Sequence, residues 1–250
     1  MPDLFSDEGL AELRSLAADR TLLAFDLDGT LAPIVNDPAH ARVAVGTAAR
    51  LRSLQAHWPI AVLTGRELTD AAPRLGFRPH FLFGNHGAQR PGQPNTGSMN
   101  TALDAWRRLL RANKAALHEQ GIDVEDKGLS LALHFRKAKD HCAVRVWLDS
   151  LAATLEPTVR ATHGHCVLNI TPANAADKGD ALLNAMHACG ARTCVVVGDD
   201  TNDEPAFAKA PRTSVTVRIG PESMPTCARF SLRSQESVDS LLETLEQLRA

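Results

Sequence analysis

Hydrophobic residues follow two patterns along this chain, and the order of the patterns predicts the fold class. Near its beginning and near its end, short continuous apolar runs alternate with segments of helical apolar spacing. Continuous runs are typical of strands buried on both faces, as in a parallel sheet covered by helices. The runs expected to be such strands are TLLAFDLD (21–28), IAVLTGR (60–66), TCVVVGDD (193–200) and SVTVRIG (214–220).

The middle of the chain has a different pattern. Residues 99–120 and 140–155 have helical spacing, whereas LSLALHF (129–135) alternates apolar and polar positions. Such alternation is typical of a strand in a sheet with one exposed face. Residues 158–172 are expected to form a hairpin that turns near Gly164.

These two patterns together predict an α/β fold with an insertion. We expect a Rossmann-like core with a parallel sheet and its helices in residues 1–87 and 173–250. We expect residues 88–172 to form an inserted α+β cap domain.

Composition narrows the class of protein. The 250 residues are 44% hydrophobic and 22% charged, and the net charge of −2 gives no basic field for nucleic acid. The first twenty residues carry acids and lack a long apolar run, so we expect neither a signal peptide nor a membrane partner. The five cysteines contain no Cys-x-x-Cys pair, which favours reduced thiols and a cytoplasmic protein. The sequence leaves the oligomeric state open, and a monomer fits it.

Carboxylates gather where the predicted strands end. In an open parallel sheet the carboxyl ends of the strands meet at one edge. Asp26 and Asp28 end the first run, and Asp199, Asp200 and Asp203 end or follow the third. These like charges would repel one another without a cation, and their hard oxygen atoms suit Mg²⁺. We therefore predict a magnesium site at this edge.

A metal site does not require two acids as close as Asp26 and Asp28, but phosphoryl transfer does. Asp26 could attack a phosphorus atom, while Asp28 could protonate the leaving alcohol and later activate water. Gly29 would allow the tight turn that follows, and Thr30 would help to hold the phosphate.

Two more polar residues stand at the ends of predicted elements. Thr64 follows the second strand, and Lys178 begins a predicted helix. The hydroxyl and the ammonium could stabilise the charge that develops on a transferred phosphoryl group. Alone, Thr64 could equally be a helix cap, and Lys178 would be read as a surface lysine. The order of Thr64 and Lys178 in the sequence relative to the aspartates favours the interpretation that both belong to a phosphoryl-transfer site.

Four motifs, DLDGT, LTGR, DKGDAL and GDDTNDE, resemble in order the four motifs of the haloacid-dehalogenase-like phosphatases. The resemblance implies a nucleophile at Asp26, an acid/base at Asp28, and phosphate ligands at Thr64 and Lys178. It implies a magnesium site made by Asp26, the carbonyl of Asp28, and Asp199. Asp200 and Asp203 match acidic positions near the metal, either as ligands or as groups that hold the ligands.

The middle segment indicates what the leaving group could be. On the alternating strand, Ser130 and His134 share one face, and the polar residues around them suit a ligand with many hydroxyl groups. VEDKGLSLALHFRKA, GNHGAQR and APIVNDPAHARV resemble segments of the trehalose-6-phosphate phosphatases. This resemblance implies hydrolysis of trehalose 6-phosphate and a sugar-phosphate site bordered by Gly29, Thr30, Gly65, Arg66, Asn85, His86, Gly87, Glu125, Lys127, Ser130, His134, Arg136 and Asn169.

Two departures keep other substrates open. That family commonly carries Glu and Arg or Lys where this chain has Asn169 and Thr171, and Glu where it has Gln89. An amide can bind hydroxyl groups, but without the charge that strengthens such hydrogen bonds. Sucrose phosphate and a glycosyl phosphoglycerate are therefore alternative substrates. A phosphomutase and a non-catalytic sugar-phosphate-binding regulator are less favoured, because the inserted domain suits one leaving group and all the catalytic positions are filled.

Overall fold

The structure, a computed structural model, divides into two compact units. One unit comprises Met1–Pro91 with Ala176–Ala250, and the other comprises Gly92–Ala175. The sequence places the expected boundaries at 87/88 and 172/173. The residues that the structure describes are 1–16, 20–35, 37–92, 100–153, 158–164, 166–220 and 225–248.

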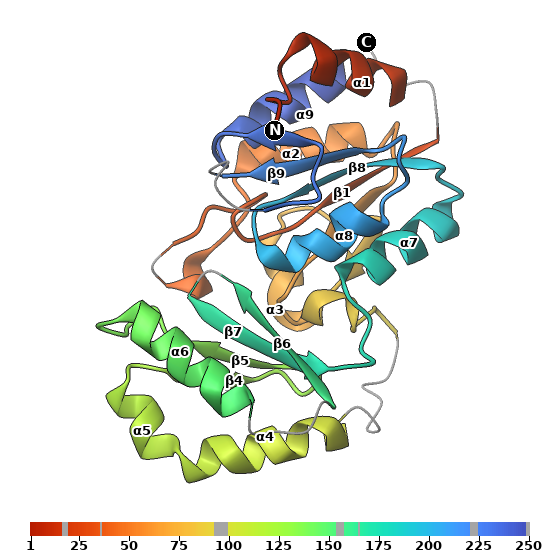
Figure 1. Cartoon of the computed structure of the whole chain (residues 1–250). Helices are drawn as coiled ribbons and strands as arrows, with labels where there is room; N and C mark the ends of the chain where they lie inside the picture. Colours follow the sequence, from red (N-terminus) through yellow and green to blue (C-terminus); the bar gives the residue numbers. More distant parts are fainter. Residues whose placement is uncertain are drawn as a thin grey trace. The chain divides into compact units, whose positions relative to one another are not determined.

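The first unit contains a six-stranded parallel sheet in the order β10-β9-β8-β1-β2-β3. Its strands β9, β8 and β1 are labelled in Figure 1. Phe25, the last residue of β1, lies opposite Val62 of β2 and Val197 of β8, so β1 runs through the middle of the sheet. The strands are β1 (Thr21–Phe25), β2 (Ile60–Leu63), β3 (Phe81–Phe83), β8 (Thr193–Gly198), β9 (Val215–Ile219) and β10 (Phe230–Leu232).

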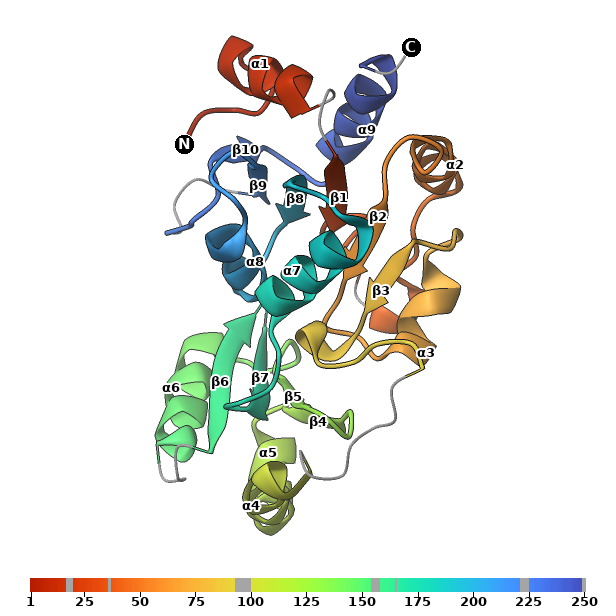
Figure 2. The same ribbon diagram turned by 90° about the vertical axis from the view of Figure 1, so that its right-hand side faces the viewer.

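Helices cover both faces of this sheet (Figure 2). On one face α1, α2 and α9 pack against alternate strand residues such as Leu23 and Phe25. On the other face α7 and α8 pack against Leu22 and Ala24. Both sets of side chains in β1 are therefore buried, which explains its continuous apolar run. The helices are α1 (Asp7–Leu16), α2 (Val45–Leu54), α3 (Leu68–Ala71), α7 (Lys178–Cys189), α8 (Glu204–Lys209) and α9 (Ser237–Gln247).

The second unit is an antiparallel sheet in the order β4-β5-β7-β6, with helices that share its core. Leu131 and Leu133 of β5 lie in that core together with Trp106, Val144 and Leu148. The intervening residues of β5 point to the opposite face, as the alternation predicted. The elements are α4 (Asn100–Ala112), α5 (Lys114–Glu119), β4 (Asp123–Asp126), β5 (Leu131–His134), α6 (His141–Ala152), β6 (Val159–Gly164) and β7 (Val167–Pro172).

The predicted fold class, a parallel α/β sheet plus an α+β unit, is confirmed. The expected helix over 99–120 is instead two helices, because Asn113 leaves helical geometry and its side-chain nitrogen donates to the Leu109 carbonyl at 2.8 Å. Residue 99 lies outside the described residues. The hairpin turns where expected, since Gly164 lies opposite Val167. Among the described helices, none is long and apolar enough to cross a bilayer.

Candidate active site

The first unit brings the predicted catalytic residues to the carboxyl edge of its sheet. Asp26 follows β1, Thr64 follows β2, and Asp199 follows β8. Because these strands are parallel and adjacent, their ends lie side by side. Asp26 and Thr64 are buried, and the backbone N–H of Asp26 donates to the Val197 carbonyl at 2.9 Å. The hydrogen bonds of the sheet therefore fix where Asp26 emerges.

Lys178 joins two of the acids. Its ammonium lies 2.7 Å from Oδ1 of Asp26 and 2.7 Å from Oδ1 of Asp203. All three side chains are buried. Burial opposes the charged form of the lysine, but the two carboxylates outweigh it and raise the pKa of Lys178. The lysine is therefore a permanent positive charge beside the proposed nucleophile.

The first turn of α7 places this lysine. Asp177 caps the helix by accepting from the backbone N–H of Asp180, and the Asp180 carboxylate accepts from the N–H of Asp177 in return. Lys209 of α8 binds both carboxylates, with its ammonium 2.9 Å from Asp177 Oδ1 and 2.6 Å from Asp180 Oδ1. A side chain at Gly179 would collide with the Pro205 carbonyl oxygen, at 2.3 Å from its Cβ. Close packing of α7 on α8 thus holds Lys178 in place.

Asp203 organises the loop after β8. Its Oδ2 accepts from the backbone N–H groups of Asp199 and Asp200, both at 3.0 Å. Gly198 lies directly beside this carboxylate, because a Cβ at position 198 would lie 2.3 Å from the carboxyl carbon of Asp203. Asp203 therefore connects the acidic loop to Lys178.

Three carboxylates converge tightly enough to hold a cation. Oxygen atoms of Asp26, Asp199 and Asp203 all lie within 4.8 Å of one another. Burial raises the pKa of Asp26 to about 7, although Lys178 opposes the shift. Burial and the negative charges of Asp26, Asp203 and Asp200 raise the pKa of Asp199 to about 9. One lysine does not balance this negative charge. The carboxylate oxygens are hard donors that still lack a compensating positive charge, and they therefore fit a divalent cation such as Mg²⁺.

Asp200 lies outside this cluster. Its carboxylate caps the short helical turn Thr201–Asp203 by accepting from the Thr201 N–H at 2.7 Å, and it also accepts from the Asn202 side chain at 3.1 Å. In the described structure, its carboxylate therefore belongs to the loop rather than to the group of three.

The turn after Asp26 also contacts the acidic group. Gly29 has a φ of +85°, and a Cβ at this position would lie 2.1 Å from Oδ2 of Asp199. Only glycine fits such a conformation and such an approach. The Thr30 hydroxyl donates to Oδ1 of Asp199 at 3.3 Å. Both predicted phosphate-loop residues thus lie beside the three carboxylates.

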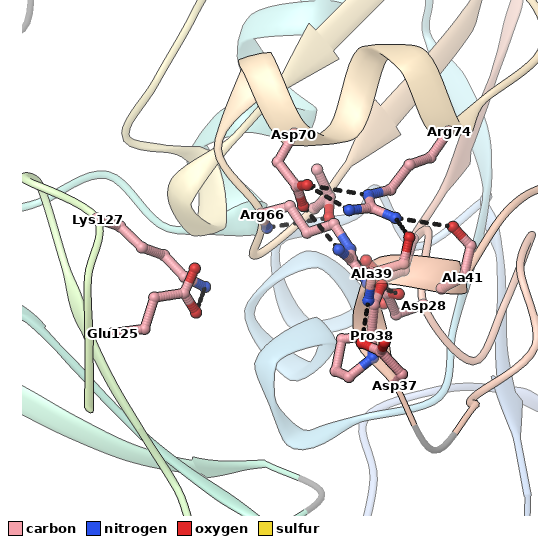
Figure 3. Close-up of polar contacts among 12 residues, drawn as sticks. Asp28, Asp37, Pro38, Ala39, Ala41, Arg66, Asp70, Arg74, Glu125 and Lys127 are labelled. Carbon is pink, nitrogen blue, oxygen red and sulfur yellow. Dashed lines mark hydrogen bonds and ion pairs between the residues drawn. The ribbon is translucent and has the colours of Figure 1, made fainter. Parts of the chain in front are cut away.

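Asp28 is held by an arginine. Nε and Nη2 of Arg66 donate to its two carboxylate oxygens, each at 2.7 Å (Figure 3). Nη1 of the same arginine donates to Asp70 at 2.6 Å, and Nη2 also donates to the Pro38 carbonyl at 2.9 Å. The sequence associated Arg66 with the substrate, whereas in the structure the guanidinium binds the proposed acid/base.

The predicted residues Asn85, His86 and Gly87 form a tight turn against this region. Asn85 and His86 both have positive φ angles, and the Asn85 N–H donates to the Arg66 carbonyl at 2.8 Å. The His86 ring covers Gly65, where a Cβ would lie 2.5 Å from Cε1 of the histidine. Gly87, with a φ of +107°, lies directly against the carbonyl of Asp177. The turn therefore joins the loop after β2 to the start of α7.

Predicted sugar contacts also gather in the second unit. Oε2 of Glu125 lies 3.0 Å from Nε2 of His134 and 3.6 Å from Nζ of Lys127. The Lys127 N–H donates to the Ser130 carbonyl at 2.9 Å. Asn169 lies on β7 between Leu168 and Ile170, which enter the core, so it shares the polar face of the sheet. Arg136 follows β5, and its carbonyl oxygen lies 3.3 Å from Nε2 of His141.

Sequence reasoning missed the residues that hold the site together. Asp70 and Arg74 support Arg66, Asp177 and Lys209 support Lys178, and Gln89 accepts from the Asn85 side chain and the Leu68 N–H. A carboxylate could accept the same two hydrogen bonds as Gln89. The spacing of Arg66, Asp70 and Arg74 at i, i+4 was a usable signal, since it aligns side chains on one side of a helical turn.

Comparison with known proteins identifies the family. Residues 24–237 match the family model described as trehalose-phosphatase. The chain is 30% identical to trehalose-phosphate phosphatase from Mycobacterium leprae, over 98% of the chain and 61% of that protein. It is 33% identical to the protein of the same name from Mycobacterium bovis, over 92% of the chain and 59% of that protein. The chain thus spans about three fifths of these relatives' length.

Solved structures share the fold. The C-terminal domain of trehalose-6-phosphate phosphatase from C. albicans superposes with a TM-score of 0.80 at 22% identity, covering 99% of both chains. A trehalose-6-phosphate phosphatase related protein gives 0.71 at 22% identity, over 92% of this chain and 98% of the other. A haloacid dehalogenase-like hydrolase from Bacteroides thetaiotaomicron gives 0.61 at 14% identity, over 91% and 99%. With four ordered motifs at one sheet edge and a family match over most of its length, the chain belongs to the trehalose-phosphatase family.

Proposed function

We propose that this protein is a Mg²⁺-dependent phosphatase that hydrolyses trehalose 6-phosphate to trehalose and phosphate in the cytoplasm, through a phosphorylated Asp26. The observation that carries the proposal is the convergence of Asp26, Asp199 and Asp203 around Lys178 at the carboxyl edge of the sheet, in a chain of the trehalose-phosphatase family.

In the first step, a carboxylate oxygen of Asp26 attacks phosphorus. The bond between phosphorus and the sugar oxygen breaks, and its electron pair remains on that oxygen, which takes a proton from the carboxyl group of Asp28. Trehalose leaves, and Asp26 carries the phosphoryl group.

In the second step, water attacks the same phosphorus atom and gives a proton to the Asp28 carboxylate. The bond between phosphorus and Asp26 breaks, which releases phosphate and restores both acids. Arg66 donates to both oxygens of Asp28, and these hydrogen bonds orient the carboxyl group for this step.

The other residues at the edge stabilise charge. Lys178 faces the phosphoryl group that Asp26 would carry, and Thr64 presents a hydroxyl at the neighbouring strand end. Asp26, Asp199 and the carbonyl of Asp28 would hold Mg²⁺, with Asp203 and Asp200 supporting them; the ion offsets negative charge on the phosphate and its ligands.

We assign specificity to the second unit, proposed as the domain 88–172. Its polar sheet face carries Glu125, Lys127, His134 and Asn169, whose charged and amide groups suit hydroxyl groups. Arg136 and Ser130 adjoin this set, and Gly65, Arg66, Asn85, His86 and Gly87 are proposed to border the phosphate.

A second candidate substrate follows from the amide of Asn169. The family commonly has a charged acceptor at this position, whereas this chain has an amide. The amide favours a substrate with a different arrangement of hydroxyl groups, such as sucrose phosphate or a glycosyl phosphoglycerate. A sucrose-phosphatase from Synechocystis shares the fold with a TM-score of 0.58 at 16% identity, over 92% of this chain and 98% of that one.

The test is release of phosphate from trehalose 6-phosphate, sucrose 6-phosphate and glucosyl phosphoglycerate, each measured with Mg²⁺ and with EDTA. We expect the highest kcat/KM for trehalose 6-phosphate, loss of turnover in EDTA, and recovery with Mg²⁺. Equal or higher kcat/KM for another sugar phosphate would replace the substrate but keep the chemistry. Turnover unaffected by chelation would exclude the metal, and binding without any turnover would favour the regulator.

A further inference from the structure

We propose that Asp70 is a positioning residue that fixes Arg66 and, through it, the carboxyl group of Asp28. The inference rests on the proposed function, because it concerns how the proton reaches the leaving group. Asp70 lies on α3, outside the four motifs, and does not itself contact Asp28 through any hydrogen bond found among the described residues.

Arg66 is held from several sides. Two of its nitrogens bind Asp28, and Nη1 and Nη2 bind Asp70 and the Pro38 carbonyl. Its side chain is only 13% exposed. The planar guanidinium therefore cannot turn without breaking hydrogen bonds on another edge.

Asp70 is fixed in turn by a second arginine. Nε and Nη2 of Arg74 both bind Oδ1 of Asp70, at 3.1 and 2.5 Å. Nη1 of Arg74 donates to the carbonyls of Ala39 and Ala41 (Figure 3). Burial opposes ionisation of Asp70, but these two arginines outweigh it and hold its pKa below the usual value. The result is a row of alternating charges made by Arg74, Asp70, Arg66 and Asp28. At the Arg74 end, the row is bound to the carbonyls of Ala39 and Ala41, which follow the DLDGT motif in the chain.

The proposed reaction explains why such a row is useful. As a carboxylate, Asp28 accepts from both nitrogens of Arg66, but as a carboxylic acid one of its oxygens becomes a donor and that hydrogen bond is lost. Asp28 passes through both forms in each cycle. Asp70 and the Pro38 carbonyl can hold Arg66 in both forms of Asp28. Of these two partners Asp70 carries the charge, so we expect it to contribute most to keeping the guanidinium in place through the change.

Asp70 should therefore matter most where proton donation matters most. An alcohol leaving from a sugar phosphate needs a proton, whereas p-nitrophenolate is a stable anion at neutral pH and leaves without one. A misplaced Asp28 therefore slows transfer of the phosphoryl group from the sugar phosphate to Asp26, and it largely spares the same transfer from p-nitrophenyl phosphate. The later hydrolysis of the phosphorylated Asp26 also uses Asp28 and is the same for both substrates. A general loss of structure slows both.

The test is kcat/KM of the full chain with Mg²⁺ on trehalose 6-phosphate and on p-nitrophenyl phosphate, because this ratio reports transfer of the phosphoryl group to Asp26 and not its later hydrolysis. Asp70→Asn is expected to lower kcat/KM on the sugar phosphate about 10- to 100-fold, and on p-nitrophenyl phosphate less than about 3-fold. Glu246→Gln is the matched control, because it also removes an acid paired with an arginine, Arg50, in the same unit. This variant should leave both activities unchanged.

Equal losses on both substrates, or no loss on either, would overturn the inference. If Asp70→Asn does not fold, as judged by its thermal transition, Arg74→Lys decides the question by the same comparison, since lysine cannot make the forked contact with Asp70. A wild-type chain inactive on both substrates contradicts the proposed function itself. An active wild type whose variants lose both activities equally contradicts only the role of Asp70.

Discussion

Nζ of Lys178 lies 2.7 Å from Oδ1 of Asp26, and both side chains are buried. The same ammonium holds Asp203 at the same distance. A buried cation between two buried carboxylates contributes to the fold as well as to the proposed chemistry, because each acid would otherwise be an unpaired charge away from water.

Lys178→Met is therefore expected to reduce both stability and turnover. Breaking a buried ion pair by removing one partner costs about 3 to 5 kcal/mol at neutral pH. Loss of the charge beside the phosphoryl group is expected to lower kcat at least about 100-fold. Denaturant unfolding and phosphate release measure the two effects.

Lys209→Met is the matched control for stability. Lys209 also contacts two carboxylates, Asp177 and Asp180, but its side chain is 36% exposed. Exposed ion pairs contribute at most about 1 kcal/mol. Similar destabilisation by both variants would contradict the importance that we assign to burial at Lys178.

Asp26→Asn is expected to abolish turnover, by at least about 1000-fold, while the chain stays folded. An amide has nearly the same shape and removes one charge from a crowded cluster, so stability should not fall at high pH. Mass spectrometry after rapid acid quenching should find a phosphoryl group on the wild-type chain and none on the variant. Undiminished hydrolysis by Asp26→Asn would exclude a covalent intermediate at this residue.

The raised pKa of Asp199 predicts how the stability of the metal-free chain depends on pH. Burial and neighbouring acids raise it to about 9, against about 4 in an unfolded chain. The folded state then binds the proton more tightly, so the contribution of Asp199 is full below about pH 4 and is lost as pH rises toward 9. Relative to Asp199→Asn, the wild type in EDTA should lose stability over this range.

Denaturant unfolding of both chains between pH 5 and pH 9 checks this difference. Adding Mg²⁺ should stabilise the wild type most at high pH, where the ion does not compete with protons, and should have little effect on the variant. Parallel stability curves for the two chains in EDTA would show that Asp199 ionises normally.

Gly87→Ala is expected to damage the start of α7. The Cβ would lie 2.3 Å from the Asp177 carbonyl oxygen, at a φ of +107° that L-residues rarely adopt. Gly220→Ala is a matched control, because its φ is +113° but among the described residues, its chain neighbours aside, no atom lies within 4 Å of the Cβ. The control should cost about 1 to 3 kcal/mol of unfolding free energy from backbone strain alone. Gly87→Ala should cost more and also reduce kcat, since Lys178 follows Asp177.

Much of the core could be predicted because its signals are local. Apolar runs marked β1, β2 and β8, and parallel pairing then required their polar ends to meet. The short strands were harder. β4, with the sequence DVED, is exposed throughout and has no apolar alternation, so nothing in its composition distinguishes it from a loop. β10 has only three residues.

Most supporting contacts of the site could not be derived from sequence. Arg66 was assigned to the substrate through the resemblance to the trehalose-6-phosphate phosphatases, but its partner depends on how the turn at α3 aligns it with Asp28 and Asp70. Asp200 was grouped with the other acids by proximity in sequence, whereas its carboxylate turns back to the Thr201 N–H. Such choices depend on side-chain rotamers, which hydrophobic patterning does not encode.

The pairing of β1 with β8 has a consequence for how the protein is made. Thr21 lies opposite Thr193, so the middle of the sheet joins segments separated by most of the polypeptide. Contacts so distant in sequence form slowly and late. During translation, β1 leaves the ribosome long before β8 and stays without this neighbour until residues 193–198 have been made. A newborn chain should therefore assemble the carboxyl edge of this sheet only after β8 has emerged, and β1 needs protection from aggregation until then.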